Sequence, residues 1–215
     1  MKIWDISRTL SNDFAEWPGD EPFRYRVTRE IAKGASVNLG AITMSVHNGT
    51  HVDAGFHFDV NGASMEKAPL EIYLGRATVL DLSESFSKST EKHLITREDL
   101  RPHAEEIAAT LRLLVKTGRW SDSTAFPNRI PVIAADVPPW LQKNGVKLLG
   151  IDLPSMDEID SKSLPNHHAL AHSGIAIMES LDLSDVAPGI YNLAALPLKI
   201  AGGDGAPVRA VLWRD

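Results

Sequence analysis

The chain has 215 residues, of which 43% are hydrophobic and 23% charged, a balance that supports a sizeable globular core. Its formal net charge is −6 and its basic residues form no block, so we expect neither nucleic acid nor an anionic membrane as a partner. The chain has no cysteine, no apolar signal-peptide core behind Met1 and no apolar run of bilayer length, and we therefore expect a cytoplasmic protein.

Strand-like segments dominate the pattern. After a first short strand over residues 3–6, residues 23–31 alternate apolar and arginine side chains, which predicts a strand with one buried face. Residues 42–46 alternate in the same way and lead directly into His47. Further strands are predicted over residues 77–82, 111–116, 132–135, 146–151, 175–178, 189–196 and 208–213.

Helices are predicted to be fewer and shorter. Thr96, with Asp99 three residues on, has the pattern of a capping box. Asp136, followed by two prolines in a first turn and closed by Asn144-Gly145, predicts a helix over residues 136–143, and a third helix begins near Asn166. The order strand, helix, strand over residues 132–151 suggests one right-handed βαβ unit. We therefore predict a mixed α/β single domain, rich in strands, over residues 1–215.

The most informative stretch is His-Asn-Gly-Thr-His-Val-Asp-Ala-Gly-Phe-His at residues 47–57. Two glycines let its backbone bend so that the polar side chains can converge. Because the chain lacks cysteine, a tightly held transition metal must rely on imidazole and carboxylate, the set that suits zinc, manganese or iron. The stretch therefore predicts a metal site.

A trio of ligands from this stretch would leave one metal position open, as catalytic zinc sites do. His47, His51 and Asp53 could form that trio, with His57 free for proton transfer. The alternative is a polar loop in which Thr50 caps a helix and Asp53 makes an Asx-turn.

The carboxylate of Asp53 could also bridge to a second metal if more ligands come from elsewhere in the chain. His167 and His168 precede a helical stretch, and Glu179 ends an apolar run. A carboxylate buried there must be paired or bound to metal, whereas the alternative is a solvated Glu at a strand end. Asp152 also follows an apolar strand, where it could face a cleft or cap a turn or helix.

Residues 47–57 resemble the His-x-Gly-Thr-His-x-Asp-x-Pro-x-His signature of the cyclase family. The resemblance continues at residues 1–7, which match the family's opening strand, and at Trp17-Pro18-Gly19-Asp20, which matches its tryptophan-bearing substrate loop. His167-His168 with Glu179 matches its C-terminal His and Glu pair. The similarity therefore covers essentially the whole chain. The chain departs from the signature at one position, where Gly55 replaces the family's proline.

The resemblance implies roles for particular residues. His47, His51 and Asp53 would hold one zinc ion; Asp53, His167 and Glu179 would hold a second, with Asp53 and Glu179 bridging; His57 would be the proton donor and acceptor; Trp17 would contact the substrate. The family spacing favours His167 over His168 as the ligand. Replacement of proline by Gly55 removes a fixed φ before His57 and affects no ligand.

The fold that the resemblance implies is a mixed α/β domain of the swivelling-domain type around a barrel-like core, usually in a homodimer with the active site near the interface. The implied activity is zinc-dependent hydrolysis of N-formyl-L-kynurenine, a small molecule, to L-kynurenine and formate in tryptophan degradation. Two alternatives remain open: hydrolysis of another amide, a lactone or a cyclic imide, and a metal-binding protein without turnover.

Overall fold

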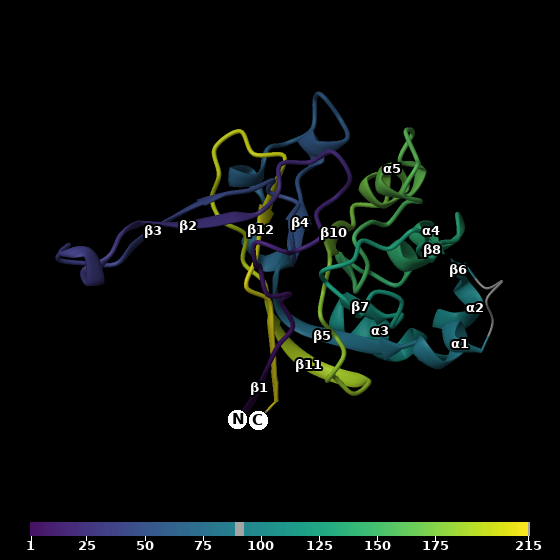
Figure 1. The fold of residues 1–215 in the computed structure, drawn as a ribbon. Helices are drawn as coiled ribbons and strands as arrows, with labels where there is room; N and C mark the ends of the chain where they lie inside the picture. The colour runs from purple at the N-terminus through teal and green to yellow at the C-terminus, as the bar shows by residue number, and fades with distance from the viewer. Residues whose placement is uncertain (89–92, 215) are drawn as a thin grey trace.

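A nine-stranded sheet, curled into a half-barrel, forms the body of the molecule (Figure 1). The computed structural model describes residues 1–88 and 93–214. The strands follow one another across the sheet in the order β1 (Lys2–Asp5), β13 (Val211–Arg214), β11 (Gly189–Ala194), β5 (Leu74–Asp81), β7 (Arg112–Lys116), β9 (Leu148–Ile151), β10 (Ala176–Glu179), β4 (His51–Asp53) and β12 (Gly205–Pro207). The four strands from β5 to β10 are parallel, and all the others pair antiparallel. The mixed, strand-rich α/β fold predicted from the sequence is confirmed.

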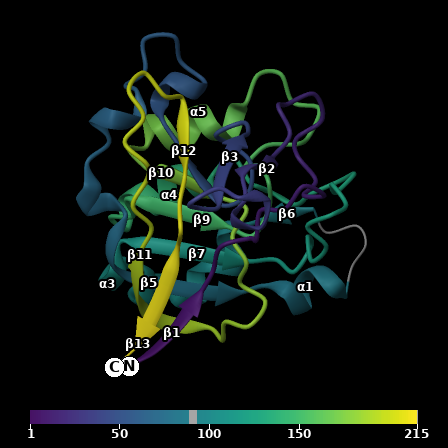
Figure 2. The ribbon, with the colours of Figure 1, turned by 60° about the vertical axis from the view of Figure 1, so that its left-hand side comes forward.

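The two ends of the described chain meet in this sheet. β1 and β13 pair along their whole length, and the termini lie side by side at the lower edge of the molecule (Figure 2). None of the helices in the described part of the chain has the length and hydropathy needed to cross a bilayer.

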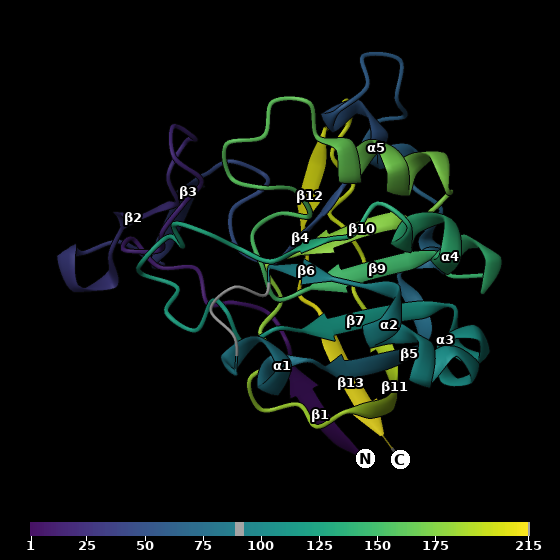
Figure 3. The same ribbon diagram turned by 90° about the vertical axis from the view of Figure 1, so that its right-hand side faces the viewer.

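Short helices cover one face of the parallel strands (Figure 3). They are α1 (Ser83–Ser87), α2 (Arg97–Leu100), α3 (Ala104–Thr110), α4 (Val137–Lys143) and α5 (Pro165–His172), with single 3₁₀ turns η1 (Ile31–Lys33), η2 (Gly55–His57), η3 (Met65–Lys67), η4 (Leu70–Ile72) and η5 (Arg101–His103). The capping box at Thr96 and the helices over residues 136–143 and near Asn166 are as predicted. α1 and α3 were not predicted.

Two hydrophobic cores lie on opposite faces of the sheet. On β7, Leu113 and Val115 pack against the helices, whereas Leu114 points into the interior of the curl. β9 divides in the same way, because successive side chains of a strand point to opposite faces. Parallel strands that are buried on both faces are therefore continuous apolar runs, as the sequence of both strands shows.

A two-stranded ribbon extends away from the body (Figure 1). It consists of β2 (Arg24–Arg29) and β3 (Leu39–Thr43), joined through η1. Phe23, just before β2, is buried, but every residue of β2 is exposed. The predicted buried face is therefore wrong for Tyr25 and Val27, which are 49% and 46% exposed and on which nothing in the described chain packs as a core. β3 ends at Thr43, and His47 lies in the turn beyond rather than directly after a strand.

The predicted βαβ unit over residues 132–151 is also wrong. β8 (Val132–Ile133) pairs with β6 (Leu94–Ile95) in a separate small sheet, while β9 lies between β7 and β10. The strands before and after α4 therefore belong to different sheets. β8 cannot pair with β9, because β7 and β10 already occupy both sides of β9.

Asp152, which immediately follows β9, caps a turn. Its buried carboxylate accepts hydrogen bonds from the backbone amides of Thr117 (2.9 Å) and Gly118 (2.7 Å) and from the Thr117 hydroxyl (2.7 Å). Of the two readings of this residue, the structure supports the cap. The carboxylate fixes the turn that follows β7.

We predict that Asp152→Ala lowers the free energy of unfolding by about 2–4 kcal/mol, because it leaves buried amide donors without an acceptor. Urea unfolding followed by circular dichroism measures the change. Asp122→Ala, which removes an exposed carboxylate that accepts from Thr124 in the same loop region, should leave the midpoint close to that of the unchanged protein. Equal midpoints for the two variants would contradict the capping role.

Candidate metal centre

Strand alternation places two of the candidate ligands on one face of β4. His51 and Asp53 point to the side on which the helices lie, while Val52 between them packs in the interior core. On the neighbouring β10, Glu179 is the direct antiparallel partner of His51. The register of these two strands therefore places an imidazole and two carboxylates beside one another.

Turns before and after β4 carry the other two histidines of the motif. Gly49 has φ +68°, and a Cβ there would lie 2.7 Å from Leu10 Cδ2, so the first of the two glycines bends the chain as predicted. Gly55 needs no positive φ; it begins the 3₁₀ turn η2, which ends at His57. The rings of His47 and His57 lie 4.0 Å apart.

The fourth histidine comes from helix α5. The carboxylate of Asp157 accepts hydrogen bonds from the backbone amides of Asn166 and His167, at the start of this helix, and lies 2.7 Å from His167 Nδ1. This contact turns Nε2 of His167 toward Asp53 and Glu179. His168 points elsewhere and packs against the ring of Phe58.

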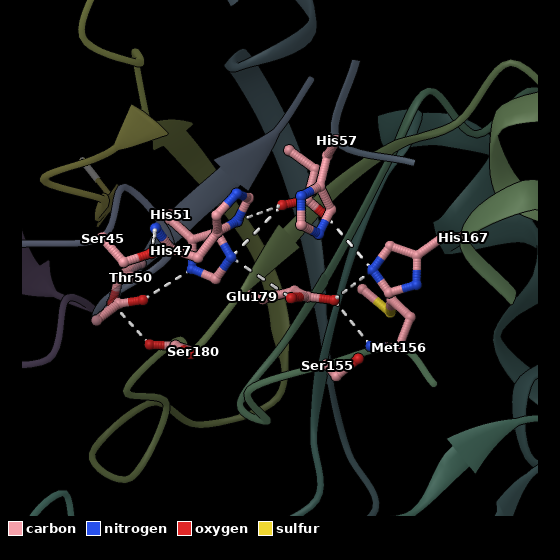
Figure 4. A network of polar contacts seen from close by, with 12 residues as sticks. Ser45, His47, Thr50, His51, His57, Ser155, Met156, His167, Glu179 and Ser180 are labelled. Atoms are coloured by element: carbon pink, nitrogen blue, oxygen red, sulfur yellow. Dashed lines mark hydrogen bonds and ion pairs between the residues drawn. The ribbon is translucent and has the colours of Figure 1, made fainter. Parts of the chain in front are cut away.

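Two carboxylates thus lie between histidines on either side, as Figure 4 shows for Glu179 between His51 and His167. The distances between opposed atoms are 3.2 Å for His47 Nδ1–Asp53 Oδ1, 3.5 Å for His51 Nε2–Asp53 Oδ1, 3.5 Å for His51 Nε2–Glu179 Oε2, 3.4 Å for His167 Nε2–Asp53 Oδ2 and 3.4 Å for His167 Nε2–Glu179 Oε1. Each carboxylate offers one oxygen to each side.

These spacings suit a metal better than hydrogen bonds. Nearly all exceed normal N–H···O distances, and among the described residues neither buried oxygen of Asp53 has a hydrogen-bond partner. Ligand atoms about 2.0–2.1 Å from a tetrahedral ion lie about 3.3 Å from one another. The donor atoms of His51, Asp53 and Glu179 all fall within 4.8 Å of one another, and so do those of His47, Asp53 and His57. The residues present therefore fit a metal ion.

The outward-facing ring nitrogens are also held. His51 Nδ1 lies 2.9 Å from the Gly49 carbonyl, His47 Nε2 lies 3.0 Å from Asp204 Oδ2, and His167 Nδ1 contacts Asp157. Contacts of this kind fix the orientation of metal-binding imidazoles. Asp157 and Asp204 were not predicted from the sequence, where the only signal for Asp204 was its position in a glycine-rich turn.

The electrostatics of the centre favour a cation. Burial alone would lower the pKa of His51 and His167, but the surrounding carboxylates outweigh it and raise the pKa of His51 to about 10 and that of His167 to about 12. Burial would raise the pKa of Asp53, yet the histidines hold it well below its usual range. Without an ion, protons on the imidazoles balance the carboxylates; a bound cation would replace them.

His57 differs from these groups. Its side chain is 31% exposed, compared with 2–4% for His51, His167 and Glu179. Burial lowers the pKa of His57 below its ordinary value, so the ring is neutral at pH 7 and can accept a proton.

The motif's threonine is structural. Thr50 Oγ1 accepts from the backbone amide of Arg8 (2.9 Å) and donates to the carbonyl of Ser180 (2.6 Å), which joins the segment after β1, the start of β4 and the end of β10. It caps no helix, and Asp53 makes no Asx-turn within the described structure. The loop alternative is therefore not what the chain adopts.

A cavity of about 240 Å³ opens onto these histidines and Glu179. Its outer wall is aromatic: Trp17 lies 5.4 Å from Phe126, which lies 6.1 Å from Trp120, which in turn lies 6.0 Å from Phe14 (all between ring centroids). Trp17 thus lines the cavity, together with Phe14, Trp120 and Phe126, which were not predicted from the sequence.

Arg8 supports Trp120 in the aromatic wall of the cavity. Its guanidinium lies 3.9 Å from the ring centroid of Trp120, and Nη2 donates to the carbonyls of Trp120 (2.7 Å) and Asp152 (2.9 Å). The buried cation therefore fixes Trp120 through stacking and a hydrogen bond at once.

Comparison with known proteins identifies the family. The family model described as "Putative cyclase" matches residues 4–158. The kynurenine formamidase of Geobacillus thermodenitrificans (strain NG80-2) is 46% identical over 99% of this chain and 98% of that protein, and that of Bacillus thuringiensis subsp. konkukian (strain 97-27) is 43% identical over 97% and 95%. A solved structure of a potential metal-dependent hydrolase with cyclase activity is 26% identical, with a TM-score of 0.79 over 98% of this chain and 96% of that one. An isatin hydrolase, 20% identical with a TM-score of 0.81 over 98% and 91%, shares the fold. The chain therefore belongs to the cyclase family and is a metal-dependent hydrolase.

Proposed function

We propose that this protein hydrolyses N-formyl-L-kynurenine to L-kynurenine and formate in tryptophan degradation, with two zinc ions per subunit. The observation that carries the proposal is the pair of carboxylates between two sets of histidines, beside a cavity with an aromatic wall. The curated relatives, 46% and 43% identical over nearly the whole chain, are named kynurenine formamidase, which supports this substrate.

The proposed ligands divide into two sets. His47, His51 and Asp53 would hold one zinc ion, and Asp53, His167 and Glu179 the other, with both carboxylates bridging. The opposed oxygens of Asp53 and of Glu179 support this division, and imidazole with carboxylate at tetrahedral spacing suits zinc. When bound, the ions would supply Lewis acidity to the formyl carbonyl and to the attacking water.

Trp17 would bind the aromatic ring of the substrate. Its indole lines the cavity and meets Phe126 edge-on, so the anilide ring can pack against a preformed aromatic surface. A ring held there keeps the formyl group at the inner, histidine-lined end of the cavity.

His57 would carry the proton. Water adds to the formyl carbon, the C–N bond breaks, and the departing nitrogen must gain a proton because an anilide anion is a poor leaving group. Neutral His57 can take that proton from the attacking water and deliver it to the nitrogen, while the formic acid released loses its proton to solvent. The position of His57 at the cavity, beside His47, supports this role.

Residues 1–215 would form one metal-dependent hydrolase domain, since strands from both ends of the described chain share one sheet with the metal centre. A cytoplasmic location stays a prediction from the sequence.

We also propose that the protein forms a homodimer. The ribbon of β2 and β3 supports the dimer, because it exposes the apolar side chains of Tyr25, Val27, Ile31, Leu39 and Ile42.

The first test is hydrolysis of N-formyl-L-kynurenine, followed by the absorbance of kynurenine, with chelator-stripped and zinc-reloaded protein. We expect turnover that is lost on stripping and restored by zinc. A zinc-loaded protein that leaves this substrate intact would contradict the proposal, and a panel of other formanilides, a lactone and a cyclic imide would then identify the hydrolase activity.

His57→Ala should retain zinc and lose most turnover, roughly 10²–10⁴-fold, because it removes the proton carrier and no ligand. His51→Ala should lose both zinc and activity. Metal analysis by mass spectrometry and steady-state kinetics measure the two effects. A His57→Ala enzyme with an unchanged rate would exclude His57 as the proton carrier.

The dimer is tested on the ribbon. Ile42→Asp places a charge on a side chain that is 61% exposed, so the fold should survive while association weakens. Light scattering after size exclusion should show a monomer. Val60→Asp, at a position 83% exposed outside the ribbon, is the matched control and should stay dimeric. A dimer that persists in Ile42→Asp would place the interface elsewhere.

A further inference from the structure

One carboxylate lies at the edge of two histidine rings. Asp204 Oδ2 is 3.0 Å from His47 Nε2 and 3.6 Å from His57 Nδ1. The two rings are 4.0 Å apart and tilted by 34°, so both present a nitrogen to the same oxygen. His47 is a proposed metal ligand and His57 the proposed proton carrier, which makes Asp204 the shared neighbour of two different functions.

The loop that carries Asp204 is held on both sides. The backbone carbonyl of Asp204 accepts a hydrogen bond from the amide of Ala54 (2.9 Å), and that of Gly203 accepts one from the amide of Met65 (2.8 Å). On the other side, the Gly202 amide donates to the carboxylate of Glu66 (3.0 Å). These contacts fix the backbone before β12. The carboxylate of Asp204 is therefore placed by the fold and does not depend on a free loop end.

The next residue explains how the contact can be so close. Gly205 pairs with Asp53 across β12 and β4, and a Cβ at Gly205 would lie 2.7 Å from His47 Cε1. A side chain at this position would collide with the His47 ring, so glycine lets the ring come close enough to contact Asp204. The glycine-rich turn at residues 202–205 is thus shaped around His47.

We propose that Asp204 is a positioning residue for both histidines, an inference that rests on the proposed function. It accepts the Nε2 hydrogen of His47 and so turns Nδ1 toward Asp53 and the metal. It faces Nδ1 of His57 and so keeps Nε2 of that ring for the substrate. At 3.6 Å the second contact is longer than a hydrogen bond. We expect it to shorten when substrate binds, as catalytic hydrogen bonds often do.

The two contacts have separate consequences. Loss of the His47 contact frees a ligand ring and weakens metal binding, whereas loss of the His57 contact slows proton transfer at full metal occupancy. Asp204 does not line the cavity, so it should affect kcat more than KM. A residue that only stabilised the loop would change neither the zinc affinity nor the dependence on His57.

The experiment compares Asp204→Ala and Asp204→Asn with a matched control, each made in the wild-type and the His57→Ala backgrounds. Asp59→Asn is the control, since it removes the same charge two residues from His57 and its carboxylate accepts only a local amide, that of Asn61, in the described structure. Zinc affinity is measured by competition with a chromophoric chelator, and kcat and KM with saturating zinc. Circular dichroism of each variant checks the fold.

Asp204→Ala should weaken zinc binding about 10–100-fold and lower kcat by a similar factor, with KM nearly unchanged. Asp204→Asn, which keeps an acceptor oxygen, should recover most of the zinc affinity. In the His57→Ala background, Asp204→Ala should still weaken zinc binding but should cause no further loss of kcat, because a residue that acts through His57 is silent without it.

Wild-type zinc affinity in folded Asp204→Ala and Asp204→Asn overturns the His47 contact. An equal loss of kcat in both backgrounds overturns the action through His57. The zinc measurement needs no substrate, so it tests Asp204 even if N-formyl-L-kynurenine is the wrong substrate, and the failure of the two proposals can be told apart.

Discussion

The burial of Asp53 and Glu179 against each other is the constraint on which the rest of this structure depends. Both side chains are almost wholly buried, and two adjacent carboxylates without positive charge would be very unfavourable there. The sheet edge, helix α5 and the turns on either side of β4 supply imidazoles on opposite sides of the pair. Without a metal ion, only protonated histidines can balance the negative charge of the two carboxylates. The fold therefore favours binding of a cation between them.

Strand register converts this demand into geometry. β4 lies between β10 and β12, which places Glu179 opposite His51 and Gly205 opposite Asp53. A shift of one residue in either pairing would turn the ligands to the other face, into the interior core. The apolar neighbours Val52, Met178 and Ala206, all packed in that core, therefore fix the register by which the polar residues meet. Core packing and the candidate centre are two faces of the same strands.

What the sequence could predict follows from how far apart the interacting residues lie. The spacing at residues 47–57 is local, so four candidate residues could be read from it, and an apolar run ending in Glu179 pointed to a buried carboxylate. Alternation at Tyr25 and Val27 indicated a strand but not what would cover it, and the ribbon leaves both exposed. Asp157 and Asp204 are single carboxylates in turns; only the folded chain brings them to His167 and His47. The sheet to which β8 belongs likewise depends on a distant pairing, because β7, and not β8, pairs with β9.

The departure at Gly55 shows how a lost local constraint is replaced by tertiary ones. Proline would fix φ before His57. Here the amide of Phe56 donates to the carbonyl of Ala63 (3.1 Å), and that of His57 donates to Ala54 (3.0 Å). Gly62 packs so closely that a Cβ there would lie 2.2 Å from the carbonyl carbon of Gly55. Backbone contacts across the loop thus hold the turn that presents His57. Because a side chain at Gly62 would press these segments apart, the placement of His57 depends on that glycine.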